Sequence, residues 1–295
     1  MCEKSCVAFC KQLTLEDVEK TANFLKSKVD IQPRIGIICG TGLAGITSLL
    51  NNPEVIPYAN IPYFPIATVA GHGNKLIFGY LGPTPVVCMQ GRFHFFEGYP
   101  LWQVVFPVRV MKLLGISTLV LTNGAGSINN SYAVGDIMFI KDHINLVNFG
   151  GMNPLQGYND ESFGQRFVPM NEVYDLNILK IAKTTAKELR MKGIQEGVYA
   201  CVGGPSFETV AEAKALKVLG ADVVGTSTVH EVIAAKHCGL KCFAFSLITT
   251  KCPMDYGGKN TIMHEDILAV GKSREAEVLR FMQRLFANLA QQNAA

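Results

Sequence analysis

Charge is scarce in this sequence of 295 residues: charged side chains make up 17% of it, and the formal net charge is +3 at pH 7. Such a chain lacks the strongly basic surface that binds nucleic acids or anionic membranes. No apolar run reaches the length of a membrane span, and charged residues interrupt the N-terminus where a signal peptide would need an apolar stretch. These absences predict a soluble, cytoplasmic protein whose partners are small molecules or other subunits.

Motifs for metal binding and for hydrolysis are also missing. The nine cysteines form no Cys-x-x-Cys pair, and Cys2, Cys6 and Cys10 have no second Cys or His cluster near them, so we interpret them as incidental thiols. The chain has no Gly-x-Ser-x-Gly, and its pairs His230-Glu231 and His264-Glu265 lack the second His of His-Glu-x-x-His. We therefore expect neither a metal site nor a serine hydrolase.

Short apolar runs alternate with longer helical stretches, in a chain that is 48% hydrophobic. The runs are rich in Val, Ile and Phe, which is typical of buried strands. Capping boxes and apolar stripes mark the helices. This alternation predicts a single α/β domain with helices on both sides of a sheet. The predicted strands are Arg34–Cys39, Lys75–Tyr80, Pro85–Met89, Thr118–Thr122, Asp136–Ile140, Gly197–Val202, Asp222–Gly225 and Lys241–Ile248, and the predicted helices are Leu15–Val29, Thr209–Gly220, Val232–Cys238 and His264–Gln291.

The loop Gly40–Gly45 follows the first predicted strand and has the Gly-x-Gly-x-x-Gly spacing of dinucleotide-binding proteins. A second strand ending in an acidic residue should come next, but Pro57, Pro62 and Pro65 interrupt that region, which argues against NAD. Glycines in such a loop let backbone N–H groups approach an anion, and Thr41 adds a hydroxyl donor. The loop is either a phosphate cradle or a tight turn with no ligand.

Arg92, His94 and Glu97 crowd together directly after the strand Pro85–Met89. The fork of an arginine matches phosphate oxygens, a histidine can donate to phosphate, and a carboxylate can orient the imidazole. A surface salt bridge is the alternative interpretation.

Three further loops of small and polar residues follow predicted strands, which is where α/β proteins place their sites. They are Thr122–Ser127, Gly203–Thr209 and Gly225–Glu231. Five such loops together indicate a ligand site.

These motifs resemble those of the trimeric purine nucleoside phosphorylases, of the 6-oxopurine type, in the nucleoside phosphorylase family. The resemblance covers nearly the whole chain, so residues 1–295 are expected to form a single nucleoside phosphorylase-like domain. It implies one α/β domain around a mixed, partly barrel-like sheet flanked by helices. It also implies a homotrimer with sites near subunit interfaces. It implies no metal and no organic cofactor, with inorganic phosphate as a substrate. The matching stretches are Ile37–Leu43, Val69–His72, Gln90–His94, Glu97–Pro100, Gly204–Thr209, Ser227–Val229 with Glu231-Val232, and Ser246–Thr249.

The resemblance implies phosphorolysis of a nucleoside to free base and ribose 1-phosphate, with each subsite carried by matching positions. Thr41 stands at a usual Ser, and the backbone N–H of Gly124, at a usual Ala, would contact phosphate. Glu208 would read the base, Phe207 would stack on it, and a neighbouring subunit would lend Phe167. The implied phosphate-binding residues are Thr41, Arg92, His94, Gly124 and Ser227. The implied nucleoside-binding residues are Phe96, Phe167, Phe207, Glu208, Thr226, Thr250 and His264. The implied catalytic residues are His94, Glu208 and Thr250.

Three positions depart from the family pattern where the nucleoside would bind: Thr250 replaces an Asn, Phe96 a Tyr, and Thr226 a Met. An Asn can both donate and accept at the departing base, whereas Thr has one short hydroxyl. The sequence leaves three alternatives open: a slower purine phosphorylase, a phosphorylase with altered base preference (methylthioadenosine, another 6-aminopurine or a pyrimidine nucleoside), and a relative that binds nucleosides as a sensor or carrier without turnover.

Overall fold

A computed structural model describes residues 13–40, 43–257 and 264–292 of the chain. Thr41 and the early cysteines Cys2, Cys6 and Cys10 lie outside these residues. The structure therefore describes all five candidate loops except residues 41–42 of the first.

One mixed sheet runs through the described part of the chain, where it has nine strands. The strands are β1 (Ile35–Cys39), β2 (Asn51–Pro57), β3 (Lys75–Leu81), β4 (Thr84–Gln90), β5 (Thr118–Ser127), β6 (Ile137–Asn145), β7 (Ile194–Cys201), β8 (Val223–Gly225) and β9 (Lys241–Lys251). They join in the order β2-β3-β4-β1-β5-β8-β7-β6-β9, and β5 also pairs with β9. That last pairing closes β5, β8, β7, β6 and β9 on one another, which confirms the expected α/β fold with a mixed, partly barrel-like sheet.

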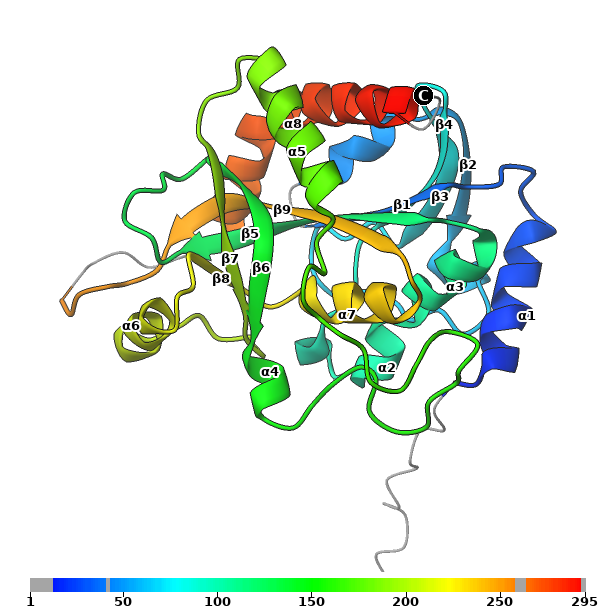
Figure 1. Cartoon of the computed structure of the whole chain (residues 1–295), viewed down its shortest axis with the longest axis horizontal. Helices are drawn as coiled ribbons and strands as arrows, with labels where there is room; N and C mark the ends of the chain where they lie inside the picture. The colour runs from blue at the N-terminus through cyan, green and yellow to red at the C-terminus, as the bar shows by residue number, and fades with distance from the viewer. Residues whose placement is uncertain (1–12, 41–42, 258–263, 293–295) are drawn as a thin grey trace, which may run out of the picture.

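Helices cover both faces of this sheet (Figure 1). They are α1 (Leu15–Lys26), α2 (Leu101–Val104), α3 (Phe106–Leu114), α4 (Leu146–Phe149), α5 (Leu176–Glu188), α6 (Val210–Val218), α7 (Val229–His237) and α8 (His264–Gln292), with short 3-10 turns at Ala44–Leu49, Tyr58–Asn60 and Phe95–Glu97. α5 and α8 pack on one face of the sheet and α1, α2, α3 and α7 on the other, and each face has its own apolar core. Two covered faces explain why the central strands are continuous apolar runs.

The two predicted capping boxes are present. Thr14 Oγ1 accepts from Asp17 N at 3.4 Å, and the Asp17 carboxylate accepts from Thr14 N at 2.9 Å. Thr209 and Glu212 make the same pair of bonds at 3.2 and 2.7 Å, directly before α6. Over residues 13–40, 43–257 and 264–292, no helix has both the length and the apolar character to cross a membrane.

Five helices and strands were not predicted from the sequence: β2, α3, α5 and the one-turn helices α2 and α4. β2 is an edge strand whose side chains are mostly exposed, and its prolines, Pro53 and Pro57, hide it because proline is tolerated only at a sheet edge. α3 is amphipathic: Phe106, Val110 and Met111 are buried, whereas Arg109 and Lys112 are only partly buried. α5 is amphipathic and is capped by Asp175, whose carboxylate accepts from Ile178 N at 2.9 Å, a signal that the sequence did contain.

Gly40 directly follows β1 and lies close to the backbone of β5. Its N–H donates to Thr122 Oγ1 at 2.9 Å, and an added Cβ would lie 2.4 Å from the Thr122 carbonyl O. Backbone cannot yield as a flexible side chain can, so we predict that Gly40→Ala lowers the free energy of unfolding by about 1–3 kcal/mol. Urea denaturation followed by circular dichroism measures this.

Gly203→Ala is the matched control, because a Cβ there meets no atom of the described residues within 4 Å. We expect its unfolding free energy to stay within about 0.5 kcal/mol of the original. Equal stability of the two variants would contradict the close approach of β1 and β5.

Candidate active site

A cavity of about 370 Å³ opens at the ends of β4, β5, β8 and β9, beside the loop that precedes α6. Strands in α/β folds commonly end at ligand sites, because their loops converge on one edge of the sheet. The cavity brings together most of the residues expected at the site: Arg92, His94, Phe96, Gly124, Phe207, Glu208, Thr226, Ser227 and Thr250.

The other expected site residues are not placed in this cavity. Phe167 is 85% exposed and lines a different hollow of the surface. Thr41 and the side chain of His264 lie outside the described residues. Within the described ranges, no three His, Cys, Asp or Glu side chains are grouped so that they could hold a metal ion.

Parts of two predicted loops, and the residues after one predicted strand, belong to regular elements. The stretch Thr122–Ser127 continues β5, and β9 runs on to Lys251, so Thr250 lies on a strand. α7 begins at Val229, which places Glu231 in its first turn. Glycine and threonine made Thr122–Ser127 look like a loop. Closure of the barrel supplies backbone partners on both sides of β5, which keeps this segment extended.

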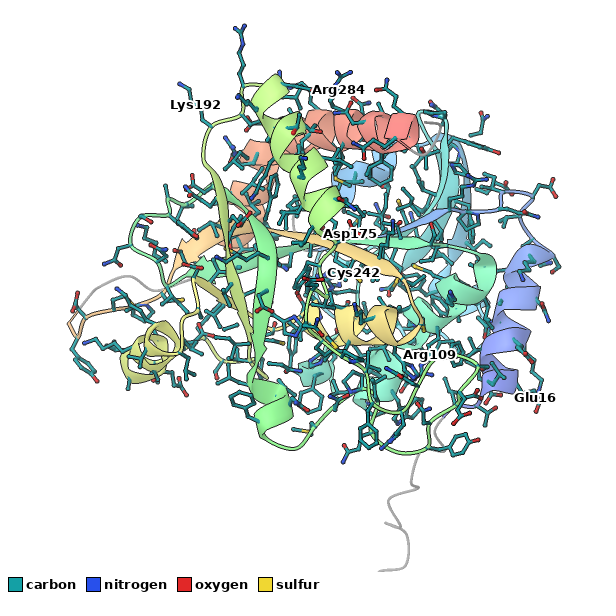
Figure 2. The ribbon with its side chains drawn as sticks, viewed as in Figure 1. Glu16, Arg109, Asp175, Lys192, Cys242 and Arg284 are labelled. Carbon is teal, nitrogen blue, oxygen red and sulfur yellow. The ribbon has the colours of Figure 1, made fainter. Side chains whose placement is uncertain are left out.

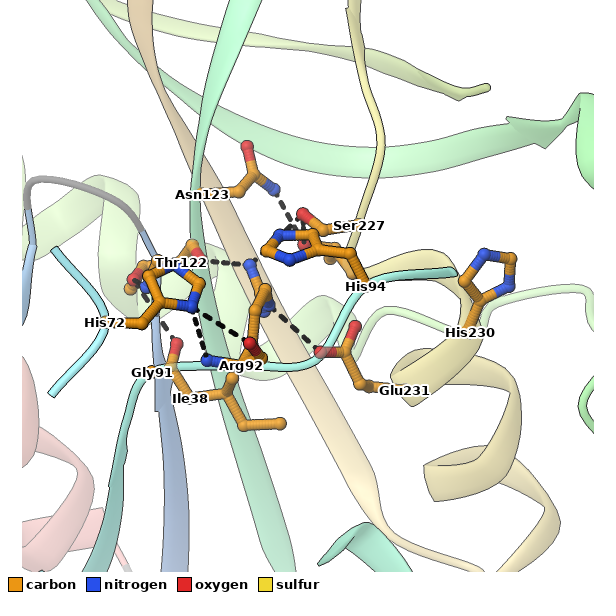
Figure 3. A network of polar contacts seen from close by, with 12 residues as sticks. Ile38, His72, Gly91, Arg92, His94, Thr122, Asn123, Ser227, His230 and Glu231 are labelled. Atoms are coloured by element: carbon orange, nitrogen blue, oxygen red, sulfur yellow. Dashed lines mark hydrogen bonds and ion pairs between the residues drawn. The ribbon is translucent and has the colours of Figure 1, made fainter. Parts of the chain in front are cut away.

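Arg92 is the cation of the cavity, and only 1% of its surface is exposed. Its Nε donates to Glu231 Oε1 at 3.0 Å (Figure 3). Its Nη1 donates to the Thr122 carbonyl O at 2.7 Å and to Ser227 Oγ at 3.2 Å. The remaining nitrogen, Nη2, is buried without a hydrogen-bond partner in the part of the chain that the structure describes. A buried guanidinium N–H is costly to leave unpaired, so this nitrogen is a donor suited to an anionic ligand.

His94 is held by Glu97, three residues further on. Its Nδ1 lies 2.9 Å from Glu97 Oε1, and its backbone N–H donates to the same oxygen at 2.8 Å. The expected contact between the two side chains is therefore confirmed. The alternative of a surface salt bridge is wrong, because the side chains of His94 and Glu97 are only 8% and 1% exposed.

The charge state of Glu97 fixes the orientation of the imidazole proton. Burial raises the pKa of Glu97, but hydrogen bonds from His94 and Thr68 outweigh burial and lower it to about 2. An ionised carboxylate can only accept hydrogen bonds, so Nδ1 of His94 carries a proton. Nε2 is then the nitrogen that a ligand in the cavity can contact.

Three residues that support the site were not predicted as site residues. Glu231 pairs with Arg92, and His72 Nδ1 lies 2.9 Å from the Arg92 carbonyl O and 3.2 Å from its N. Burial and the neighbouring His94 lower the pKa of His72 to about 4, so it is neutral near pH 7. Asn123 lines the cavity between the strands. All three lie in stretches that the sequence singled out: Val69–His72, Thr122–Ser127 and Glu231-Val232. Their partners lie in other segments of the chain, so these contacts could not be predicted.

Asn123 also supports the turn that carries Ser227. Its Nδ2 donates to Thr228 Oγ1 at 2.9 Å. Thr228 has a φ of 71°, a conformation that β-branched residues rarely adopt. The hydrogen bond stabilises this strained turn, and the turn places the Ser227 hydroxyl beside Arg92.

Glu208 is the carboxylate of the cavity, and it comes from the loop before α6. Burial raises the pKa of Glu208 above its ordinary value. The Cys252 thiol donates to Glu208 Oε2 at 3.7 Å. Phe207, next to it in sequence, keeps 50% of its surface exposed and so has a free ring face.

Phe96 and Thr226, two of the departures from the family pattern, form one wall. A Cβ on Gly204 would lie 2.9 Å from Thr226 Cγ2 and 3.3 Å from Phe96 Cδ1, which places both side chains against the same glycine. The Phe96 ring also stacks on His94, with ring centroids 4.6 Å apart. The two replacements therefore act on the same part of the cavity.

Comparison with known proteins extends the likeness beyond the cavity. Residues 34–287 match the sequence profile of the Phosphorylase superfamily. The chain is 50% identical over 277 residues to purine nucleoside phosphorylase of Anopheles gambiae, across 94% of this chain and 78% of that protein. The Schistosoma mansoni purine nucleoside phosphorylase in complex with adenosine is 41% identical, with a TM-score of 0.89 over 92% of this chain and 97% of that one. Isoform 2 from the same organism, in complex with cytosine and ribose-1-phosphate, is 42% identical, with a TM-score of 0.88 over 92% and 96%.

The lowered pKa of Glu97 predicts that part of the free energy of unfolding is lost in acid. The carboxylate has a folded pKa of about 2 against an ordinary 4.5, so its contribution is complete above about pH 4.5 and is lost as the pH falls toward 2. We predict that Glu97→Gln removes this pH dependence, measured as the free energy of unfolding in urea at several pH values in that window. Glu19→Gln, at an exposed position on α1, should keep the original slope. An unchanged slope in Glu97→Gln would contradict the buried contact with His94.

Proposed function

The chain belongs to the phosphorylase superfamily and, within it, to the purine nucleoside phosphorylases, and we propose that it catalyses phosphorolysis of the N-glycosidic bond of purine nucleosides, giving free base and ribose 1-phosphate. It is on this proposal a pentosyltransferase that uses inorganic phosphate as its second substrate. The nonenzymatic alternative, a nucleoside sensor or carrier, has no need for an unsatisfied buried cation.

The observation that carries this proposal is the buried Nη2 of Arg92. It is a charged donor without a protein partner in the described residues, in a cavity that also holds His94 and Ser227. A doubly charged oxyanion such as phosphate supplies the acceptors that this group needs. The backbone of Gly124 and, at the first loop, Thr41 complete the proposed phosphate shell.

Phosphate held in this way attacks the anomeric carbon of the ribose. A carbon–oxygen bond forms there as the carbon–nitrogen bond to the base breaks, and the bonding electron pair leaves with the base. Positive charge develops on the ribose between the two anions, so the enzyme accelerates the reaction by orienting the nucleophile and by stabilising the departing base. Arg92, His94 and Ser227 serve the first role.

The base and the ribose occupy the rest of the cavity. Glu208 accepts the N–H at position 1 of a 6-oxopurine, and Phe207 stacks on the ring. Thr250 offers its hydroxyl to the leaving base as negative charge develops on it. Phe96 and Thr226 line the ribose side, and His264 is placed near the 5′-hydroxyl by resemblance.

The proposed assembly is a cytoplasmic homotrimer in which residues 1–295 act as one nucleoside phosphorylase-like domain, without a metal or an organic cofactor. The exposure of Phe167 supports the trimer, since an aromatic ring that is 85% exposed on one chain can cover the site of the next. The modest net charge of +3 gives no reason to propose nucleic acid or membrane partners.

A second candidate function is a phosphorylase with a different base preference. Thr250 is the observation that favours it, together with the isoform 2 of Schistosoma mansoni, whose structure holds cytosine and ribose-1-phosphate. On this reading Thr250, Phe96 and Thr226 form a cavity reshaped for a methylthio, 6-amino or pyrimidine nucleoside. A panel of nucleosides, assayed with and without phosphate for free base and ribose 1-phosphate, separates the two candidates.

We predict that base release depends on phosphate and that Arg92→Lys slows it by about 100-fold or more. Lysine keeps a positive charge beside Glu231, but it cannot contact Thr122, Ser227 and an anion at the same time. The rate is followed as hypoxanthine release from inosine over a range of phosphate concentrations.

Arg284→Lys is the control, because Arg284 lies at the outer surface, on α8 (Figure 2), where its side chain is 48% exposed and pairs with Glu188. We expect it to leave the rate unchanged. Release of free ribose at the same rate in phosphate-free buffer would refute the phosphorylase assignment.

Thr250→Asn should raise inosine phosphorolysis by about 10- to 100-fold, with only a small change in KM. The amide adds a hydrogen bond that strengthens as charge develops on the base, which is worth roughly 1.5–3 kcal/mol. Steady-state kcat and KM for inosine measure the effect, and Thr184→Asn, at an exposed position on α5, is the control. Unchanged purine turnover, with a nonpurine nucleoside as the best substrate, would instead establish the second candidate function.

A further inference from the structure

Cys252 lies directly behind the Glu208 carboxylate. It follows β9, its N–H donates to the Ser127 carbonyl O at 2.9 Å, and only 6% of the residue is exposed. Its Sγ lies 3.7 Å from Glu208 Oε2, within the range of a thiol donating to an oxygen. The thiol is thus a buried donor to one oxygen of this carboxylate.

The sheet itself fixes this placement. Thr250 and Cys252 are two residues apart along an extended chain, so their side chains point to the same side. An added Cβ on Gly126 would lie 2.9 Å from Cys252 Sγ and 3.3 Å from Thr250 Oγ1. Gly126 therefore leaves the space that both side chains occupy.

Few groups act on the ionisation of Glu208. Burial raises its pKa, and Glu212 on α6 raises it further by like-charge repulsion. Its own backbone N–H and the Cys252 thiol lower its pKa through hydrogen bonds. Arg92 and His94, from the segment after β4, are the other charged or titratable side chains that line the described part of the cavity.

We propose that Cys252 is a positioning residue that determines base specificity: its thiol donates to Oε2 of Glu208, which keeps that carboxylate ionised and leaves Oε1 to accept an N–H from the base. This inference rests on the proposed function, in which Glu208 contacts the base. It adds a donor that acts from behind the carboxylate and does not itself line the cavity.

The consequence is a choice between two classes of purine. A 6-oxopurine presents an N–H at position 1, which an ionised carboxylate accepts. A 6-aminopurine presents a lone pair at the same position, which only a protonated carboxyl group can satisfy. Loss of the thiol favours the protonated carboxyl, so it shifts preference toward the 6-aminopurine.

The test compares Cys252→Ala and Cys252→Ser with the original protein and with Cys242→Ala. Cys242 is the matched control, since it is equally buried near the start of β9 beside Asp175, away from the cavity (Figure 2). Two quantities are measured from about pH 5 to pH 9: kcat/KM for inosine and adenosine, and Kd for hypoxanthine and adenine by isothermal titration calorimetry.

For Cys252→Ala we expect the acid limb of the inosine profile to move to higher pH and the ratio of adenosine to inosine kcat/KM to rise by about threefold, because a thiol is a weak donor. The ratio of the two base affinities should move the same way. Cys252→Ser should restore both ratios, since a hydroxyl also donates, and Cys242→Ala should change neither.

An equal loss for both nucleosides with no shift in pH would overturn the proposal, because it would mean that Cys252 only packs. Failure of Cys252→Ser to restore the ratios would overturn it as well. The absence of turnover in every form, including the original protein, would instead refute the proposed function. The affinities of hypoxanthine and adenine still decide the role of Cys252 in that event, and unchanged affinities in Cys252→Ala would refute it.

Discussion

The buried ion pair between Arg92 and Glu231 is the interaction on which the rest of the site depends. Removing two charges from water is costly, and only close geometry with further hydrogen bonds offsets that cost. The Thr122 carbonyl and the Ser227 hydroxyl supply those bonds, so one side chain ties the end of β4 to β5, to the turn after β8 and to α7. Among the described residues the pair leaves Nη2 of Arg92 without a hydrogen-bond partner, and the fold thereby keeps a fixed, buried cation that is available to an anionic ligand.

The two kinds of charge in the cavity are controlled differently. Arginine is always protonated, so Arg92, in the proposed phosphate-binding part of the cavity, keeps its positive charge at every physiological pH. Hydrogen bonds from His94 and Thr68 lower the pKa of Glu97 to about 2, so this carboxylate stays ionised and orients the His94 imidazole. The pKa of Glu208, in contrast, is raised by burial, and hydrogen bonds from its own backbone N–H and from the Cys252 thiol oppose that rise. The proposed phosphate-binding residues are therefore held by several strong contacts, whereas the ionisation of Glu208, the proposed base-reading residue, depends on burial and on a few neighbouring groups.

The three departures from the family pattern on the nucleoside side of the cavity fall in two places. Phe96 and Thr226 adjoin at Gly204, and Thr250 adjoins Cys252 at Gly126. Neither place touches the pairing of Arg92 with its protein partners. Relatives 41% and 42% identical to this chain are seen with adenosine in one structure and with cytosine and ribose-1-phosphate in another. Arg92, His94 and Ser227 thus keep the family pattern, while the replacements gather around the proposed base and ribose positions, where a change would alter which nucleoside binds.

Local signals in the sequence determined much of the fold. Apolar runs located eight of the strands, the capping boxes located α1 and α6, and the three-residue spacing of His94 and Glu97 was enough to predict their contact. What the sequence could not determine were contacts between distant segments, since pairing over long separations depends on how the whole sheet closes. Arg92 and Glu231 are 139 residues apart. Closure of the barrel by β5 and β9 likewise made the apparent loop Thr122–Ser127 part of a strand, and it brought Cys252 behind a carboxylate 44 residues away in the sequence.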